Sequence, residues 1–375
     1  MPHGFLGEHA LGTGTGGMRF STLSAAALMT FAVACKDSHS PPAATTPFAP
    51  SAPALLSAGS PTKDEDPSVL LAKDGTIFVA WFSDRGGNPD IYITSTRNGH
   101  DWTPAVRVTT NAGGEFNPNL YQDDAGVFHL TWFRWTALFE GHIMYNTSAD
   151  GLTWNTANEI QATKAFNVDD WVPTITGRPD GTVLIYFVSK LRNTSNQQND
   201  LYLAMKRPGM ADFDAVVGAS GVNVPTAHEH LPFVARTGST YTLVWVRYDL
   251  SQETPWLNPK SDLYYATSTD GTSWSTPARF SNDAGNIVHL FPAMYETLDH
   301  AWSLLWLSTR SGSPQAFETP LANLGQYPAG VVANSSFPAG YSYRIAPTPV
   351  AGTYIGVWVQ GPDGSQDIYY RIFER

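Results

Sequence analysis

The stretch that decides the fold is residues 262–274, which read DLYYATSTDGTSW. Its first half carries the aromatic and apolar residues that are typical of a short β-strand. Its second half, Ser-Thr-Asp-Gly-Thr-Ser-Trp, is typical of a tight turn. In such a turn the aspartate accepts hydrogen bonds from the turn's own amides and the glycine adopts a positive φ. We expect the tryptophan that follows to pack between neighbouring sheets.

The same unit occurs six times along the chain. Each copy has a proline, then an aromatic residue in an apolar run 11 to 14 residues later, then a segment related to Asp-Ile/Leu-Tyr. Successive prolines are 51 to 60 residues apart, and a period of that length with three or four short strands is the signature of a β-propeller. The prolines are Pro67, Pro118, Pro173, Pro232, Pro292 and Pro347, the aromatic residues are Trp81, Trp132, Tyr186, Trp245, Trp306 and Trp358, and the third segment starts at Asp90, Asp200, Asp262 and Asp367, with degenerate copies at 142–145 and 315–317.

The composition of the 375 residues agrees with short aromatic strands joined by turns. The chain has 12 Trp, 16 Tyr and 19 Phe beside 32 Gly and 27 Pro, and only 15% of its residues are charged. This composition excludes a helical bundle, a coiled coil or a disordered chain. The formal charge of −11 argues against a nucleic-acid partner, which requires a cationic surface. A single cysteine excludes an intramolecular disulfide framework and a cysteine-built zinc site.

The ends of the repeat array predict how the ring closes. The sixth unit stops at Arg375, after its third strand, and propellers remove the resulting open edge by pairing it with a strand from the other end of the chain. Residues 51–60, with Ala54-Leu55-Leu56, are the predicted donor. The sequence therefore predicts an all-β protein: one six-bladed propeller of four-stranded antiparallel blades over residues 51–375, closed by an N-terminal strand and monomeric.

The N-terminal segment predicts export. From Met18, the probable start, one arginine is followed by an apolar run that ends in small residues and Cys35, which is typical of a signal peptide over residues 1–35. Small residues directly before a cysteine resemble the bacterial lipobox, which implies lipidation of Cys35 and anchoring of the protein at the cell envelope or surface. The alternative is an ordinary signal peptide with an incidental cysteine. Residues 36–50 are predicted to be a flexible linker.

One face of the ring is expected to gather charged side chains. The loop that enters the inner strand of a blade and the loop after its second strand open on the same face, and five blades place an arginine in the second loop. Such a mouth suits an anionic, hydroxyl-rich ligand; the alternative is that each arginine is ion-paired within its own turn. We expect Arg247 and Arg310 to point at one shared volume near the axis. The five arginines are Arg85, Arg134, Arg192, Arg247 and Arg310.

Three of the turns resemble a known motif. Residues 96–102, 148–154 and 268–274 are similar to the Asp box of the sialidase superfamily, with one residue fewer between Asp and Gly than in the commonest form. The resemblance covers residues 67–375. It implies a sialidase-like propeller in which these turns lie on the face away from the active site.

The resemblance also implies roles for individual residues. Sialidases use an arginine triad for the substrate carboxylate, an aspartate as acid/base, and a tyrosine nucleophile activated by a glutamate. The first arginine of the triad is replaced here by Glu65-Asp66-Pro67, and Arg344 is the candidate substitute. The predicted catalytic residues are Asp84, Glu229 and Tyr343, with Tyr341 as the alternative nucleophile, and the predicted substrate contacts are Arg247, Arg310, Arg134, Arg344 and Asp170.

Two classes of function remain open at this point. One is a glycosidase that acts on acidic terminal sugars of extracellular glycans, and the other is a non-catalytic propeller that binds glycan or protein at the cell surface. No cofactor is expected. The weaker alternatives are a calcium site and a metal site built from histidines. Their candidate ligands are Asp169, Asp170 and Glu115 for calcium, and His228, His230 and His289 for the other metal.

Overall fold

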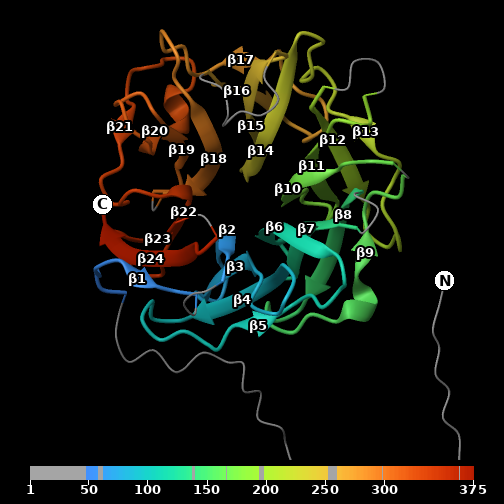
Figure 1. The fold of residues 1–375 in the computed structure, drawn as a ribbon, viewed down its shortest axis with the longest axis vertical. Helices are drawn as coiled ribbons and strands as arrows, with labels where there is room; N and C mark the ends of the chain where they lie inside the picture. Colours follow the sequence, from blue (N-terminus) through green and yellow to red (C-terminus); the bar gives the residue numbers. More distant parts are fainter. Residues whose placement is uncertain are drawn as a thin grey trace, which may run out of the picture. The chain divides into compact units, whose positions relative to one another are not determined.

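The computed structural model describes residues 48–57, 62–136, 140–165, 167–193, 198–251, 260–297, 299–362 and 364–375. Within this part of the chain, six four-stranded antiparallel sheets are arranged around one axis (Figure 1), which confirms the predicted six-bladed propeller. No helix of the described residues has the length and apolarity needed to cross a membrane. The predicted signal peptide, Cys35 and residues 36–47 of the predicted linker lie outside the described residues, whereas residues 48–50 are described and include the buried Phe48.

Each blade is built from strands that follow one another from the axis outward. Blades 1 to 3 are β2 (Asp64–Leu71), β3 (Ile77–Ser83), β4 (Asp90–Thr96) and β5 (Val106–Arg107); β6 (Gly114–Gln122), β7 (Phe128–Trp135), β8 (Gly141–Ser148) and β9 (Ile160–Gln161); and β10 (Trp171–Gly177), β11 (Val183–Ser189), β12 (Asp200–Lys206) and β13 (Val217–Gly218).

Blades 4 to 6 repeat the pattern, and two short 3-10 helices lie in the connections. The strands are β14 (Ala227–Thr237), β15 (Thr240–Asp249), β16 (Asp262–Ser268) and β17 (Ala278–Arg279); β18 (His289–Glu296), β19 (Trp302–Ser308), β20 (Gln315–Pro320) and β21 (Val332–Ala333); and β22 (Tyr341–Pro347), β23 (Thr353–Gln360) and β24 (Asp367–Glu374), joined by β1 (Ala54–Leu55); the 3-10 helices are η1 (Thr156–Asn158) and η2 (Leu321–Asn323).

The core lies between the blades, on both faces of the second strands. β3 and β11 are buried along their whole length, because each second strand is covered by a neighbouring sheet on either side. The aromatic residue at the centre of each second strand is fully buried, as the repeat pattern predicts. These six residues are Trp81, Trp132, Tyr186, Trp245, Trp306 and Trp358.

The N-terminal segment closes the ring as predicted. β1 adds to the outer edge of β24, where Ala54 pairs with Tyr370 and Leu55 with Tyr369, so that the two ends of the described chain share blade 6 (Figure 1). Phe48, which precedes the strand, is buried in the core between blades 6 and 1. β1 and the residues beside it therefore cover the edge of β24 from Ile368 to Ile372.

The Asp-Gly-x-x-Trp turns adopt the geometry that their sequence predicts. Asp270 Oδ1 accepts hydrogen bonds from the amides of Thr272 and Ser273, and Gly271 has a φ of +69°. The indole of Trp274 donates to the hydroxyl of Tyr186 in the preceding blade. These turns thus fasten neighbouring blades together, and they lie at the ends of the third strands, opposite the mouth.

The inner strands share a feature that corrects the alignment of the sixth unit. A β-bulge interrupts each inner strand, and its first residue has a positive φ and precedes the repeated proline. In blade 6 the bulge falls between Tyr341 and Arg344, so the position of the proline is occupied by Tyr343. Pro347, which the spacing alone had matched to the other prolines, lies four residues farther along β22.

Candidate functional site

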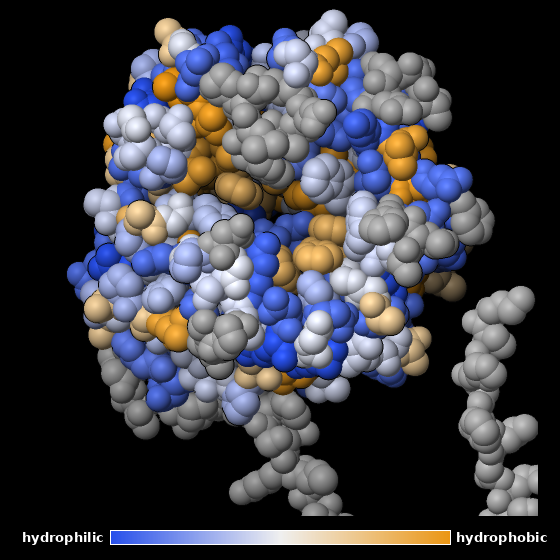
Figure 2. Space-filling view, viewed as in Figure 1, coloured by the Kyte–Doolittle hydropathy of each residue, from blue (hydrophilic) through white to orange (hydrophobic). Residues whose placement is uncertain are grey.

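The axis of the ring is hollow, and its lining defines the candidate site. A narrow cavity of about 40 Å³ begins at the mouth, the face on which the inner strands start. A wider cavity of about 310 Å³, here called the vestibule, lies at the far ends of the inner strands. The two cavities share Asn119, Phe233 and Arg344 as lining residues. Figure 2 shows the hollow at the centre of the ring.

The narrow cavity is lined by the bulges of the inner strands, which we call the collar. Six collar residues have φ values between 47° and 55°, a left-handed conformation that is costly for residues other than glycine. Val172 is the extreme case because it is β-branched. The fold therefore holds a strained backbone around the axis. The six residues are Asp66, Asn117, Val172, Leu231, Phe291 and Ser342.

Most of the mouth arginines are ion-paired within their own blades. In blade 4, Arg247 lies 2.7 Å from Glu229 Oε1 and its guanidinium covers the ring of Tyr264 at 4.0 Å. Arg310 differs, because its closest carboxylate, that of Asp283, is 3.7 Å away. The alternative of arginines paired within the blade thus describes four of the five. The pairs are Arg85–Asp64, Arg134–Glu115, Arg192–Asp170 and Arg247–Glu229, and each of these carboxylates is fully buried.

The expected convergence of two arginines on the axis is not found. Arg247 covers the third strand of blade 4, and Arg310 lies over the ring of Tyr327 at 5.0 Å in blade 5. Neither side chain lines the collar or the vestibule. The physical reason is that a guanidinium at the end of a second strand finds a carboxylate and an aromatic ring in its own blade.

The three predicted catalytic residues lie in separate surroundings. Glu229 is buried in its pair with Arg247 and also accepts from the indole of Trp245; burial raises its pKa to about 7. The hydroxyl of Tyr343 donates to Gly340 O at 2.6 Å, and burial in the core raises its pKa to about 12. Asp84 accepts from the amide of Lys63 at 2.8 Å. Among the described residues, none of the three hydrogen-bonds another.

The other predicted polar groups of the mouth are also engaged in contacts. Both carboxylate oxygens of Asp170 accept from Arg192 at 2.7 Å. Trp306 donates to Nδ1 of His289, and Nε2 of that ring lies 3.2 Å from Asp283. Within the described ranges, no three histidine, cysteine, aspartate or glutamate side chains are arranged to hold a metal ion.

The structure instead brings together a tyrosine and two carboxylates where blade 6 meets blade 1. The hydroxyl of Tyr341 donates to Glu65 Oε1 at 2.5 Å, and Lys63 Nζ lies 3.2 Å from the other oxygen of Glu65. Asp66 follows in the collar. Burial, and then the charge of Glu65, raises the pKa of Asp66 to about 7, against the opposing charges of Arg344 and Lys63. We call Lys63, Glu65, Asp66 and Tyr341 the seam cluster.

Arg344 is the arginine of the candidate site itself. Its Nη1 donates to Tyr343 O at 2.9 Å, while its Nε is buried without a hydrogen-bond partner. No carboxylate of the described residues lies within 4.0 Å of its guanidinium, in contrast to the paired mouth arginines. Burial lowers its pKa to about 10, and the charge of Asp66 opposes that shift. The guanidinium thus stays charged at neutral pH.

Replacing Asp66 with asparagine is expected to alter the pH dependence of stability. The folded-state pKa of about 7 lies above the ordinary value of 3.8, so the folded protein holds this proton more tightly than the unfolded chain does. The stability contributed by Asp66 is therefore present below about pH 4 and is lost as the pH rises through 7. Asparagine tolerates the positive φ and cannot ionise. In urea unfolding measured from pH 4 to 8, the free energy of unfolding of the variant should rise relative to that of the parent as the pH increases. A difference that does not change with pH would contradict the raised pKa of Asp66.

Comparisons with known proteins establish the fold. No family model and no curated protein sequence matches the chain. The structure is similar to a protein of unknown function from Dyadobacter fermentans, with 12% identity, a TM-score of 0.67, and coverage of 87% of this chain and 98% of that one. It is also similar to an α-L-arabinofuranosidase from Fusarium graminearum and an arabinobiose-bound α-L-arabinanase from Penicillium chrysogenum, each at 14% identity, TM-score 0.64, and coverage of 83% of this chain and 93% of that one. The chain is thus a six-bladed propeller with structural neighbours among glycoside hydrolases.

Proposed function

We propose that this protein is an exported, surface-tethered glycosidase that hydrolyses terminal acidic sugars of extracellular glycans at its propeller mouth. The observation that carries the proposal is the seam cluster, in which a tyrosine–glutamate pair stands beside an aspartate whose pKa is about 7. Such a combination supplies a nucleophile with its activating base and a separate proton donor. The fold is one that glycoside hydrolases use.

Each member of the seam cluster has a distinct task in the proposed reaction. Glu65 takes the phenolic proton of Tyr341 as the oxygen attacks the anomeric carbon, and the bond to the leaving group breaks. Asp66, half protonated near pH 7, gives its proton to the departing oxygen. Water then attacks the anomeric carbon and gives a proton to Asp66, while the bond to Tyr341 breaks and the tyrosine takes its proton back from Glu65. A tyrosine suits a substrate with an anionic group near that carbon, because it is neutral until its proton leaves.

The charges beside the cluster support an acidic sugar. Lys63 is the partly exposed cation of the mouth, with 38% of its side chain accessible, and it is anchored by Glu65. The charge of Arg344 lies behind Asp66 and adds to the positive potential of the collar. Together they offset the two carboxylates, so that an anionic group can approach the mouth.

Substitution of two neighbouring tyrosines tests the proposal. On a panel of fluorogenic glycosides of acidic and neutral sugars, Tyr341→Phe is expected to lower kcat by at least about 100-fold, because the nucleophile is lost. Tyr343→Phe is the matched control: it removes the same atom two residues away, in the core, and should leave kcat unchanged. Loss of activity in the Tyr343 variant alone would overturn the assignment of Tyr341.

The parent protein provides a second arm of the experiment. If it hydrolyses no glycoside of the panel yet binds an acidic glycan on an array, the non-catalytic alternative holds and the catalytic proposal fails. Hydrolysis with a preference for neutral sugars would keep the seam cluster and refute the acidic substrate.

Tethering is tested separately. We propose that acylated Cys35 anchors the protein, so Cys35→Ser should move it from the membrane fraction to the soluble fraction of the producing cells. Equal partition of the parent and the variant between the fractions would refute the lipid anchor.

A further inference from the structure

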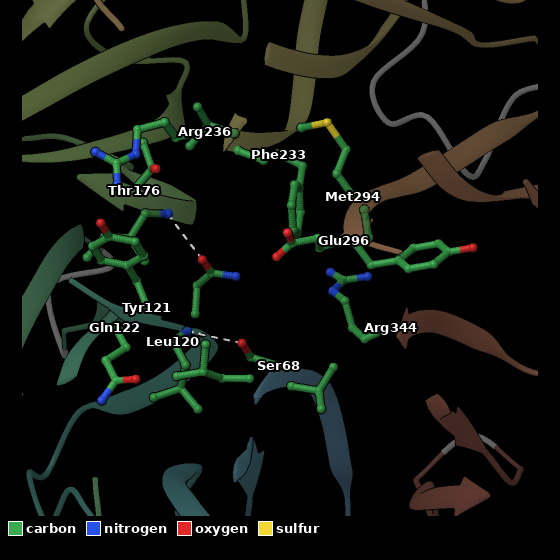
Figure 3. A pocket seen from close by; sticks show the side chains of 18 of the residues that line it. Ser68, Leu120, Tyr121, Gln122, Thr176, Phe233, Arg236, Met294, Glu296 and Arg344 are labelled. Atoms are coloured by element: carbon green, nitrogen blue, oxygen red, sulfur yellow. Dashed lines mark hydrogen bonds between the residues drawn. The ribbon is translucent and has the colours of Figure 1, made fainter. Parts of the chain in front are cut away.

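The vestibule is a second cavity, at the opposite end of the axis from the seam cluster. It is formed by the far halves of the inner strands, and its volume of about 310 Å³ lies at the lower end of the range found for small-molecule sites. One side is apolar, with Phe233 and Met294, and the other carries Tyr121, Gln122 and Thr176 (Figure 3). A cavity with an apolar wall and a few polar groups suits a small ring-bearing ligand.

Arg344 places a positive charge in this cavity that no carboxylate of the described residues contacts within 4.0 Å. Figure 3 shows its guanidinium extending among the lining side chains. One hydrogen bond to the carbonyl of Tyr343 is its only one within the described residues, and the ring of Phe233 lies 5.9 Å from its central carbon. The buried Nε of this guanidinium has no hydrogen-bond partner, which leaves a strong donor unused. An oxyanion is the best acceptor for the N–H donors of a guanidinium, because it can accept two of them at once.

Three other charged side chains line the vestibule, those of Arg236, Asp124 and Glu296. Arg236 forms a two-point ion pair with Asp124, with distances of 3.0 and 2.8 Å. The carboxylate of Glu296 lies 2.9 Å from Nδ1 of His300. Glu296 thus brings a negative charge into the same cavity, and among the described lining residues Arg344 is the arginine that has no carboxylate within 4.0 Å.

Asn119 adds a neutral polar side chain near Arg344, where the two cavities meet. Asn119, which lines both cavities, accepts from the amide of Ile175 through its side-chain oxygen at 3.1 Å. This bond fixes the orientation of the side chain and leaves its NH₂ group as a donor. The donors of Asn119 and Arg344 thus meet at the junction of the two cavities, which favours a ligand that brings acceptors.

From this geometry we propose that the vestibule binds a small carboxylate with a ring body, its carboxylate held by Arg344 and its ring against Phe233 and Met294. Two kinds of compound share this chemistry: sugar acids and aromatic acids. The site is separate from the seam cluster, and its existence does not depend on the proposed hydrolysis.

Calorimetric titration of the parent protein with sodium D-glucuronate and sodium benzoate tests the site. At least one of the two should bind, and its uncharged counterpart, D-glucose or benzamide, should bind at least about tenfold more weakly. Glucuronate alone would assign a sugar acid, and benzoate alone an aromatic acid. Binding of neither acid, or equal binding of an acid and its uncharged counterpart, would overturn the proposal.

Substitutions then locate the binding. Arg344→Met should raise Kd about 10- to 100-fold, since it removes a charge-assisted contact and keeps the apolar length of the side chain. Met294→Trp, which fills the vestibule and leaves Arg344 in place, should abolish binding and serves if the first variant does not fold. Arg97→Met is the control, because Arg97 is an exposed arginine paired with Asp74. Unchanged binding in the two vestibule variants would overturn the proposal.

Tyr341→Phe separates this site from the proposed active site. It should eliminate hydrolysis and leave the affinity for the carboxylate unchanged, because it alters only the mouth. If instead Tyr341→Phe abolishes carboxylate binding and Met294→Trp does not, the acid binds at the mouth and the vestibule site is refuted. Loss of hydrolysis has no bearing on that result.

Discussion

Arg247→Ala is expected to lower the free energy of unfolding by about 3–5 kcal/mol, although Arg247 lies at the end of a strand next to a loop. Its partner Glu229 is fully buried with a pKa already raised to about 7, so without the guanidinium it must either keep an unpaired charge or take up a proton, and in both cases the hydrogen bonds from Arg247 are lost. The ring of Tyr264 would also lose the planar group that covers it at 4.0 Å. Urea unfolding followed by tryptophan fluorescence measures the loss.

Two further variants define the cause. Replacing Glu229 with Gln in the Arg247→Ala background removes the buried carboxyl group that has lost its arginine. This second substitution should recover part of the lost free energy of unfolding. Arg97→Ala breaks an exposed pair, in which about half of each side chain is accessible, and should cost less than about 1 kcal/mol. An Arg247→Ala protein as stable as the parent would mean that Glu229 is protonated or solvated, and the pair would not be structural.

The arginine pairs show which part of the site the sequence could have revealed. In four blades the buried carboxylate precedes its arginine by 21, 19, 22 and 18 residues, and this interval is as regular as the repeat itself. The sequence shows an arginine near the end of the second strand in five blades, and this interval favours the paired alternative over a free arginine ring. Local spacing suffices here because both partners belong to one hairpin.

The seam cluster was not accessible in the same way. Tyr341 and Glu65 are 276 residues apart, and they meet only because the ring closes and makes blade 6 the neighbour of blade 1. In addition, the spacing of the prolines matched Pro347 to the repeated proline position. The bulge shows that Tyr343 occupies this position in blade 6, with its side chain in the core. The period of the repeat predicts which residues are buried and how long the strands are. It does not report which residue occupies a bulge.

Removing the closing segment is expected to have the largest effect on stability. A chain that begins at residue 62 loses Phe48 from the core and β1 from the edge of β24. It also loses the amide of Leu56 as a donor to Ile368 O at 2.8 Å. Burial of one phenylalanine contributes about 1.5–3 kcal/mol and each hydrogen bond about 0.5–1.5 kcal/mol, so the loss is on the order of 5 kcal/mol. The Tm should fall by about 10 °C or more.

A chain that begins at residue 48 is the matched control, because it keeps every contact of the closing segment and should melt with the full-length protein. A synthetic peptide of residues 48–57, added to the shortened chain, should raise its Tm in a concentration-dependent manner, since the exposed edge of β24 can accept the strand again. If the chains that begin at 48 and at 62 melt at the same temperature, β1 does not hold the ring closed. The hydrogen bonds between blades 6 and 1 would then carry the closure alone, among them that of Tyr341 to Glu65.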